Sequence, residues 1–174
     1  VIAYGAEDGA EVWRGSWLNG EVTPSPVYAG GRLILVSPMD RLLAVRPDGR
    51  GEVTATHRLW EVSEGAPDIT SPVSDGELVF TVSSGGLLEC FDARDGVKLW
   101  EQDLDGEFHA SPALADGRLY LFGVNGTAVV AAAGREYREL FRTRMADAFH
   151  ASPAFAHDRI YVRGETNVYC LGAK

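Results

Sequence analysis

Short runs of alternating hydrophobic and polar residues, separated by turn sequences, follow one another along the whole chain. The clearest stretch covers residues 70–100, where four apolar runs are divided by Asp-Gly, Ser-Ser-Gly-Gly and a second Asp-Gly. A period of two places successive side chains on opposite faces of a β-strand, and Asp-Gly between two such runs is typical of a tight hairpin. The pattern therefore predicts four antiparallel strands in this stretch.

The same arrangement occurs four times. Its phase is marked by Ser-Pro pairs at residues 25–26, 71–72, 111–112 and 152–153. An alternating apolar run follows each pair, at residues 31–36, 76–82, 117–122 and 158–162. The steps between pairs are 46, 40 and 41 residues, and the longest step contains an insertion between Asp48 and His57. Units of about 40–45 residues with four strands each are typical of the blades of a β-propeller.

The copies resemble the PQQ-like (pyrroloquinoline-quinone-like) β-propeller repeat. The copy at residues 71–100 shows the resemblance most fully, with Ser-Pro-Val-x-Asp-Gly-x-Leu beginning at Ser71 and Leu-x-Cys-Phe-Asp-Ala-x-Asp-Gly-x-x-x-Trp beginning at Leu88. The resemblance implies an all-β fold of four-stranded antiparallel blades, and a location in the periplasm or outside the cell. It also implies that an aromatic residue of each outer strand docks between blades against a glycine-containing turn. The residues in that position are Trp13, Trp60, Trp100 and Phe141.

The repeat divides the chain into one propeller region, residues 1–174, with a partial blade at each end. The partial blades cover residues 1–17 and 149–171, and full blades cover residues 21–62, 68–102 and 108–143. This division predicts seventeen strands, one more than a closed ring of four blades uses. We interpret the chain as the C-terminal half of a seven- or eight-bladed propeller. A small ring with a redundant strand and closure by a second copy stay open, and open blade faces favour self-association.

Composition mainly excludes function classes. The net charge is −9 and the basic residues are scattered singly, which argues against nucleic-acid binding because that needs clustered lysines and arginines. No apolar run approaches the roughly 20 residues that span a bilayer. Cys90 and Cys170 occupy the same phase two repeats apart, too far for a disulfide, so we expect two buried free thiols.

Candidate binding residues lie in the connections from each outer strand to the next inner strand. Two connections repeat almost verbatim as Phe-His-Ala-Ser-Pro-Ala, which places His109 and His150 at equivalent positions of adjacent strands. Two imidazoles can bind a metal ion or an anionic ligand, or the repeat has copied a histidine that bonds to a backbone carbonyl of the next blade. No third ligand accompanies them at a fixed spacing, so we predict no metal site. Acidic candidates on the same face are Asp68, Asp105 and Asp147.

Trp17 lies in one of these connections, outside the phase of the repeat. An exposed indole there would suit a contact with a protein or a glycan, whereas a buried one would cover its own blade. Both roles are compatible with the sequence.

No catalytic residues are recognisable. The chain has no Ser-His-Asp or Cys-His signature and no phosphate-binding loop. The family that it resembles includes quinoprotein dehydrogenases, but the chain has neither their adjacent cysteines nor their calcium ligands. We therefore predict a binding or scaffold module without a cofactor, with a protein partner, in an exported or cell-envelope protein. Two alternatives stay open: a fragment of a PQQ-dependent dehydrogenase, which would use PQQ and calcium, and the sensor domain of a signalling protein. The sequence favours a non-enzymatic role without deciding it.

Overall fold

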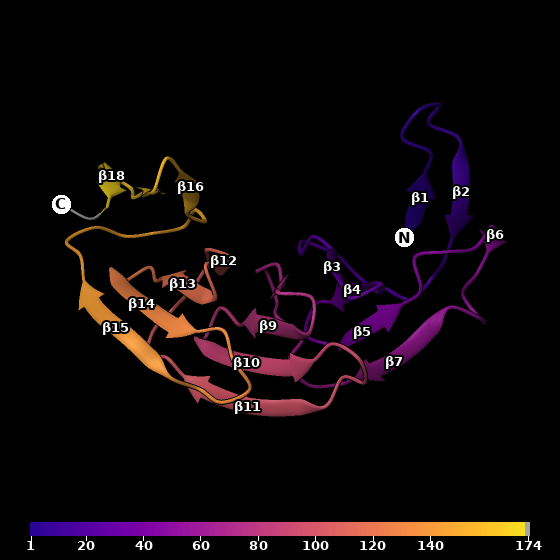
Figure 1. Ribbon diagram of the computed structural model, residues 1–174, viewed down its shortest axis with the longest axis horizontal. Helices are drawn as coiled ribbons and strands as arrows, with labels where there is room; N and C mark the ends of the chain where they lie inside the picture. Colours follow the sequence, from indigo (N-terminus) through magenta and orange to yellow (C-terminus); the bar gives the residue numbers. More distant parts are fainter. Residues whose placement is uncertain (173–174) are drawn as a thin grey trace.

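A computed structural model describes residues 1–172 as eighteen β-strands in five sheets, and this range contains no helix. The sheets follow one another around an open arc, and the two termini lie at its two ends (Figure 1). In the three complete sheets the first strand faces the hollow of the arc and the fourth strand lies on its outer rim. The prediction of an all-β, partial propeller with four-stranded antiparallel blades is confirmed.

The first complete sheet consists of β3 (Val27–Ala29), β4 (Arg32–Ser37), β5 (Arg41–Val45) and β7 (Arg58–Val62). The second consists of β8 (Val73–Ser74), β9 (Leu78–Val82), β10 (Leu87–Asp92) and β11 (Lys98–Asp103). The third consists of β12 (Ala113–Ala115), β13 (Arg118–Phe122), β14 (Thr127–Ala132) and β15 (Glu139–Arg144). The terminal sheets are β1 (Ile2–Tyr4), β2 (Glu11–Arg14) and β6 (Gly51–Glu52), and β16 (Ala154–Ala156), β17 (Arg159–Arg163) and β18 (Val168–Leu171).

The core lies between successive sheets. All five residues of β9 are buried, so this strand has apolar side chains on both faces. The cluster between the second and third complete sheets includes Phe80, Leu88, Phe108 and Leu121, each at most 1% exposed. Burying one such side chain contributes about 1.5–3 kcal/mol. Because each sheet buries both faces against neighbours, a single sheet would not be stable alone.

One strand was not predicted from the sequence. The insertion between Asp48 and His57 forms β6, which pairs in parallel with β2 of the preceding sheet, Trp13 opposite Gly51. The next residues bring Val53, 2% exposed, into the hydrophobic cluster around Trp13. The structure therefore has eighteen strands where the repeat predicts seventeen, because the insertion extends the neighbouring sheet.

The two cysteines are free but have different surroundings. Cys90 is buried, and burial raises the pKa of its thiol to about 12. Cys170 is exposed, so the prediction of two buried thiols is correct for Cys90 alone. Both residues lie on third strands, but Cys90 is opposite Trp100 of a fourth strand, whereas β18 has no fourth strand beside it within residues 1–172.

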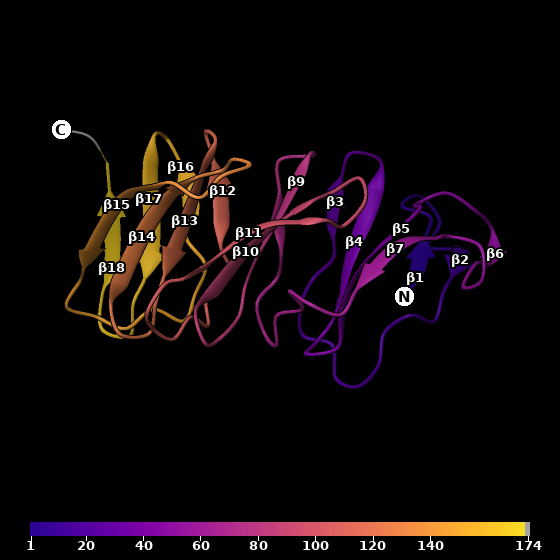
Figure 2. The same ribbon diagram turned by 90° about the horizontal axis from the view of Figure 1, so that it is seen from below.

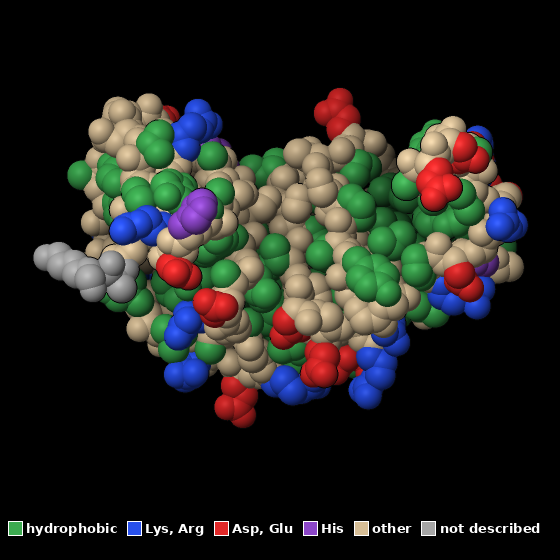
Figure 3. Space-filling model, turned by 45° about the horizontal axis from the view of Figure 1, so that its top comes forward, with side chains coloured by type: hydrophobic (Ala, Val, Ile, Leu, Met, Phe, Trp, Pro, Cys, Tyr) green, Lys and Arg blue, Asp and Glu red, His purple; other side chains and the backbone are tan. Residues whose placement is uncertain are grey.

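The turns form two opposite surfaces, seen at the two ends of the strands in Figure 2. We call one of them the loop face: it contains the connections between sheets and the hairpins between second and third strands. The opposite face contains the other hairpins. Between the two ends of the arc the surface is hollowed and carries hydrophobic side chains (Figure 3). Within residues 1–172 no helix has the length and apolarity needed to cross a membrane.

Candidate functional site

His109 and His150 are in direct contact on the loop face. Their Nδ1 atoms are 3.2 Å apart, and their ring centroids are 5.2 Å apart. The Nε2 atom of His109 lies 2.6 Å from Oε1 of Glu107, and that of His150 lies 3.2 Å from Oε1 of Glu165. The four side chains thus form a line, Glu-His-His-Glu, and neither histidine makes the bond to a backbone carbonyl that the structural alternative requires.

The backbone beside each histidine is held firmly. Phe108 and Phe149, which precede the two histidines, are both fully buried. The amide of Val124 donates to the carbonyl of Glu107 at 2.8 Å, and the amide of Glu165 donates to the carbonyl of Ala148 at 3.0 Å. These anchors fix the backbone that carries the two imidazole rings, while both side chains stay more than one-third exposed to solvent.

Asp147 turns inward and binds the hairpin between β17 and β18. Its carboxylate accepts hydrogen bonds from the amides of Ala148, Glu165 and Asn167 and from the hydroxyls of Thr166 and Tyr169, at 2.9–3.1 Å. Burial opposes its ionisation, but these hydrogen bonds outweigh that effect and hold the pKa of Asp147 far below its usual range. The carboxylate therefore orders the loop that carries Glu165.

Asp68 has a similar role two sheets earlier in the arc, at the β9–β10 hairpin. Its carboxylate accepts a hydrogen bond from the backbone amide of Ser84 at 2.9 Å and another from the hydroxyl of the same residue. Burial raises the pKa of Asp68, but hydrogen bonds from Ser84 and from backbone amides together outweigh that effect and lower the pKa. The carbonyl of Ser84 in turn accepts a hydrogen bond from the amide of Phe108 at 2.9 Å. This bond connects Asp68 to the segment before His109. Asp105 differs from both: it is exposed, with a positive φ of 58°.

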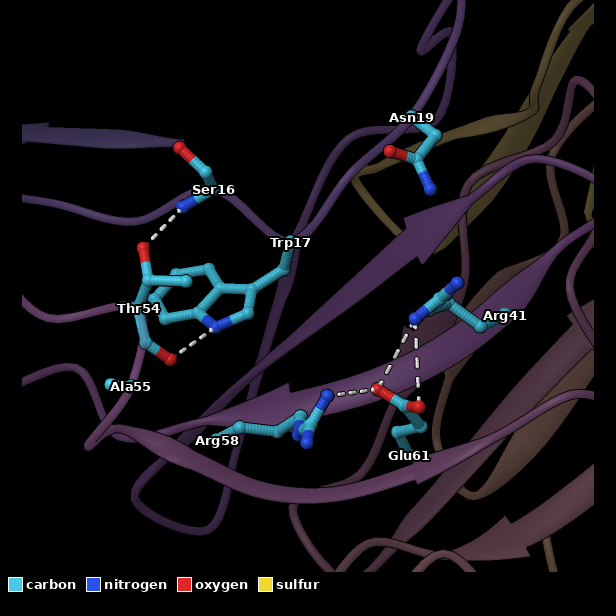
Figure 4. Close-up of a pocket in the computed structure, with 8 residues that line it drawn as sticks. All are labelled: Ser16, Trp17, Asn19, Arg41, Thr54, Ala55, Arg58 and Glu61. Carbon is cyan, nitrogen blue, oxygen red and sulfur yellow. Dashed lines mark hydrogen bonds and ion pairs between the residues drawn. The ribbon is translucent and has the colours of Figure 1, made fainter.

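Trp17 is buried, 7% exposed, and packs edge to face on Trp13 with ring centroids 6.3 Å apart. Its Nε1 donates to the carbonyl of Thr54 at 3.0 Å (Figure 4). The indole therefore covers its own sheet, and it is not the exposed contact that was one of its two predicted roles.

A polar cleft of about 410 Å³ lies beside Trp17. Its walls include Asn19, Arg41, Arg58 and Glu61 (Figure 4). Glu61 accepts from the guanidinium of Arg58 at 2.6 Å and lies 3.5 Å from that of Arg41. Sequence reasoning missed this cleft, because Arg41 and Glu61 lie on paired strands twenty residues apart.

Three tryptophans of the outer strands each reach the next sheet. Trp13 Nε1 donates to the carbonyl of Pro47 at 2.8 Å, Trp60 to that of Ala93 at 3.0 Å, and Trp100 to that of Gly134 at 2.9 Å. Phe141 is the exception, with 57% of its surface exposed. Its sheet is followed by β16–β18, which has no third-to-fourth strand turn within residues 1–172 for Phe141 to contact.

The serines of the Ser-Pro pairs also link neighbouring sheets, which the sequence analysis did not predict. The amide of Ser25 donates to Oγ of Ser71, and the amide of Ser71 donates to Oγ of Ser111, both at 2.9 Å. The regular spacing of these pairs was a usable signal, since equivalent residues of adjacent first strands lie side by side. The His109–His150 contact lies at the following junction between sheets.

Comparison with known proteins gives consistent matches. A family model described as outer membrane protein assembly factor BamB matches residues 49–136, just over half of the chain. The outer membrane protein assembly factor BamB of Marinobacter adhaerens is 29% identical over 109 residues, which cover 61% of this chain and 26% of that protein. The matched part of the chain therefore spans about a quarter of the length of this relative.

Two solved structures share the fold. The crystal structure of BamB from Moraxella catarrhalis matches with a TM-score of 0.75 and 15% identity, over 98% of this chain and 51% of that chain. The quinohemoprotein alcohol dehydrogenase ADHIIG from Pseudomonas putida matches with a TM-score of 0.65 and 15% identity, over 87% of this chain and 29% of that chain. At such identities the likeness concerns the fold alone.

Proposed function

The chain belongs to the PQQ-like repeat family whose model is described as outer membrane protein assembly factor BamB, and from this we propose that it is a β-propeller module that binds a protein partner through its loop face. In this proposal the module acts as a scaffold in the cell envelope and carries out no reaction of its own. The proposal extends to this chain the assembly role that the name of its relative states.

The order of the loop face is the observation that carries the proposal. The carboxylates of Asp68 and Asp147 each accept hydrogen bonds from a neighbouring hairpin, at Ser84 and at residues 165–167 respectively, and so hold it in place. Loops that are fixed before binding lose little conformational entropy when a partner docks. A face built in this way is suited to recognising a surface of defined shape.

The exposed charges of the loop face indicate the kind of partner. The side chains of Glu107 and Glu165 are 60% and 62% exposed, Asp105 is exposed nearby in the chain, and the net charge is −9. Complementary charges speed association and select against wrong partners. We therefore expect a partner that presents lysine or arginine side chains, and binding that weakens as salt concentration rises.

Site-specific photo-cross-linking in the full-length protein, in its native cells, tests this function. A photoreactive amino acid replaces Asp105 or Glu165 on the loop face and, as a matched control, Glu77, which is exposed in a hairpin of the opposite face. We expect both loop-face positions to form adducts with the same protein and position 77 to form none. Adducts from position 77 alone, or no adduct from either loop-face position, would contradict the proposal.

A further inference from the structure

The two histidines meet through the nitrogen atoms that are free to bind a cation. Nε2 of each ring lies within hydrogen-bond distance of a carboxylate oxygen of Glu107 or Glu165. Because an ionised carboxylate only accepts hydrogen bonds, we assign the ring proton to Nε2 as the hydrogen-bond donor. A neutral imidazole with its proton on Nε2 has a lone pair on Nδ1. The lone pairs of His109 and His150 therefore point toward each other across 3.2 Å, which is unfavourable unless a positive charge lies between them.

The spacing fits two ligands of one metal ion. Zinc–imidazole bonds are about 2.0–2.1 Å long, and two such bonds at a tetrahedral angle place their nitrogens about 3.3 Å apart. The observed Nδ1–Nδ1 distance is 3.2 Å. Histidines that bind metals also usually donate their other N–H to a carboxylate, which fixes the tautomer and makes the free nitrogen a better ligand. Glu107 and Glu165 occupy those positions.

Charge and access support the same assignment. Carboxylate side chains flank the imidazole pair on both sides, and their negative charge favours a cation between the rings. Both imidazoles are partly exposed, so an ion can enter from solvent and keep water molecules as its remaining ligands. The buried Phe108 and Phe149 hold the two backbone segments in place before an ion binds.

The sequence predicts no metal site here, but from the geometry we propose that Nδ1 of His109 and Nδ1 of His150 together bind one divalent late first-row metal ion, with Glu107 and Glu165 as positioning residues. The chemistry of two imidazole nitrogens favours Cu²⁺ or Zn²⁺ over Mg²⁺ or Ca²⁺. Within residues 1–172 no third His, Cys, Asp or Glu completes a cluster around such an ion, so water fills the other positions. The site shares Glu107 and Glu165 with the loop face that we propose as a protein-binding surface, but metal binding does not require the partner and is measured without it.

Isothermal titration calorimetry of the chelator-treated chain with Zn²⁺ as the only added metal tests the site. We expect one ion per chain, and binding that is lost in His109→Ala and in His150→Ala. The matched control is His157→Asn, which changes an exposed histidine with a positive φ of 50° on the opposite face and should bind Zn²⁺ as the unaltered chain does. Glu107→Gln combined with Glu165→Gln should weaken binding by about tenfold.

Side-chain ¹⁵N NMR of the unaltered chain makes the test independent of how the variants fold. On addition of Zn²⁺, we expect the Nδ1 resonances of both histidines to shift as coordinated nitrogens, while their Nε2 resonances keep the protonated form. Coordination through Nε2, no change at either ring, or equal Zn²⁺ binding by the chain and by the double alanine variant would overturn the proposal. The last two results would mean that the histidine pair is not the Zn²⁺ site.

Discussion

At the scale of single residues, Asp147 shows how one carboxylate can organise a loop. It accepts hydrogen bonds from several successive residues of the β17–β18 hairpin and from Tyr169, and Gly164 leaves the space that its carboxylate occupies. These bonds are made to the ionised form, so they lower its pKa. The loop that carries Glu165 therefore depends on the charge of Asp147.

Acid should lower the free energy of unfolding by protonating Asp147. A carboxyl group with a lowered pKa in the folded state contributes stability above its unfolded pKa of about 3.9, and that contribution is lost as pH falls below this value. We expect Asp147→Asn to lower the urea midpoint at pH 7 and to lose less stability than the unaltered chain between pH 5 and pH 3.

Asp105→Asn is the matched control, because Asp105 is exposed and its positive φ is one that asparagine tolerates. This variant should follow the unaltered chain at every pH. An equal loss of stability in acid for Asp147→Asn and the unaltered chain would show that other carboxyl groups control the acid response.

The repeat made part of the candidate site predictable at this scale. Since His109 and His150 occupy the same phase, their placement on adjacent strands could be predicted from the sequence. Glu165 could not, because it belongs to a hairpin fifteen residues after His150, and only the packing of that hairpin on the connecting loop brings the two together. The burial of Trp17 likewise depends on Thr54, in an insertion without a counterpart in the other repeats.

At the scale of elements, hairpins and outer strands join the sheets in pairs. The indole of Trp60 lies over the β10–β11 hairpin at Gly96, where φ is +75°. A Cβ atom at Gly96 would lie 2.7 Å from Cε3 of Trp60, well inside van der Waals contact. The glycine therefore has two functions in the hairpin: it allows the positive φ, and it leaves room for the neighbouring sheet.

Alanine substitutions separate these two functions. Gly117, in the β12–β13 hairpin, has a similar φ of +66° but nothing within 4 Å of a Cβ position. We expect Gly117→Ala to cost about 1–2 kcal/mol, the strain of the positive φ alone. Gly96→Ala should cost about 1–3 kcal/mol more, because it also overpacks the contact with Trp60.

Urea denaturation of both variants measures the difference. Equal midpoints for Gly96→Ala and Gly117→Ala would mean that the indole moves away without cost, and that this contact does not hold the two sheets together.

The order of strands could be predicted from the alternating runs, since β4, β9, β13 and β17 each begin within two residues of a predicted run. The pairing of β6 with β2 could not. Period-two alternation specifies a strand and its buried face but not its partner, and residues 48–57 have no clear alternation. Their position is fixed by contact with the preceding sheet, through Val53 and Trp13.

At the scale of the whole molecule, each sheet is stabilised mainly by its neighbours in the arc. Within residues 1–172 the central sheets have a neighbour on both sides, whereas the sheets at the two ends of the arc have one each (Figure 1). All residues of β16 are exposed, while all residues of β9 are buried. In such a linear arrangement, stability is roughly a sum of contacts between adjacent units, so the ends open first.

Hydrogen exchange followed by mass spectrometry should resolve this gradient. We expect the slowest exchange in peptides covering β9 and β10, and exchange many times faster in peptides covering β16–β18. Uniform protection along the chain would instead mean that the five sheets open together as one cooperative unit.

The strand β6 has a consequence for the modularity of this protein. In the sequence the insertion belongs to the full blade of residues 21–62, but in space it extends the edge of the preceding sheet, which contains β1 and β2. Recombination at a repeat boundary would therefore separate the outer strand of one blade from the residues that cover it. The unit that can be inherited or exchanged intact at this end of the chain is a pair of blades.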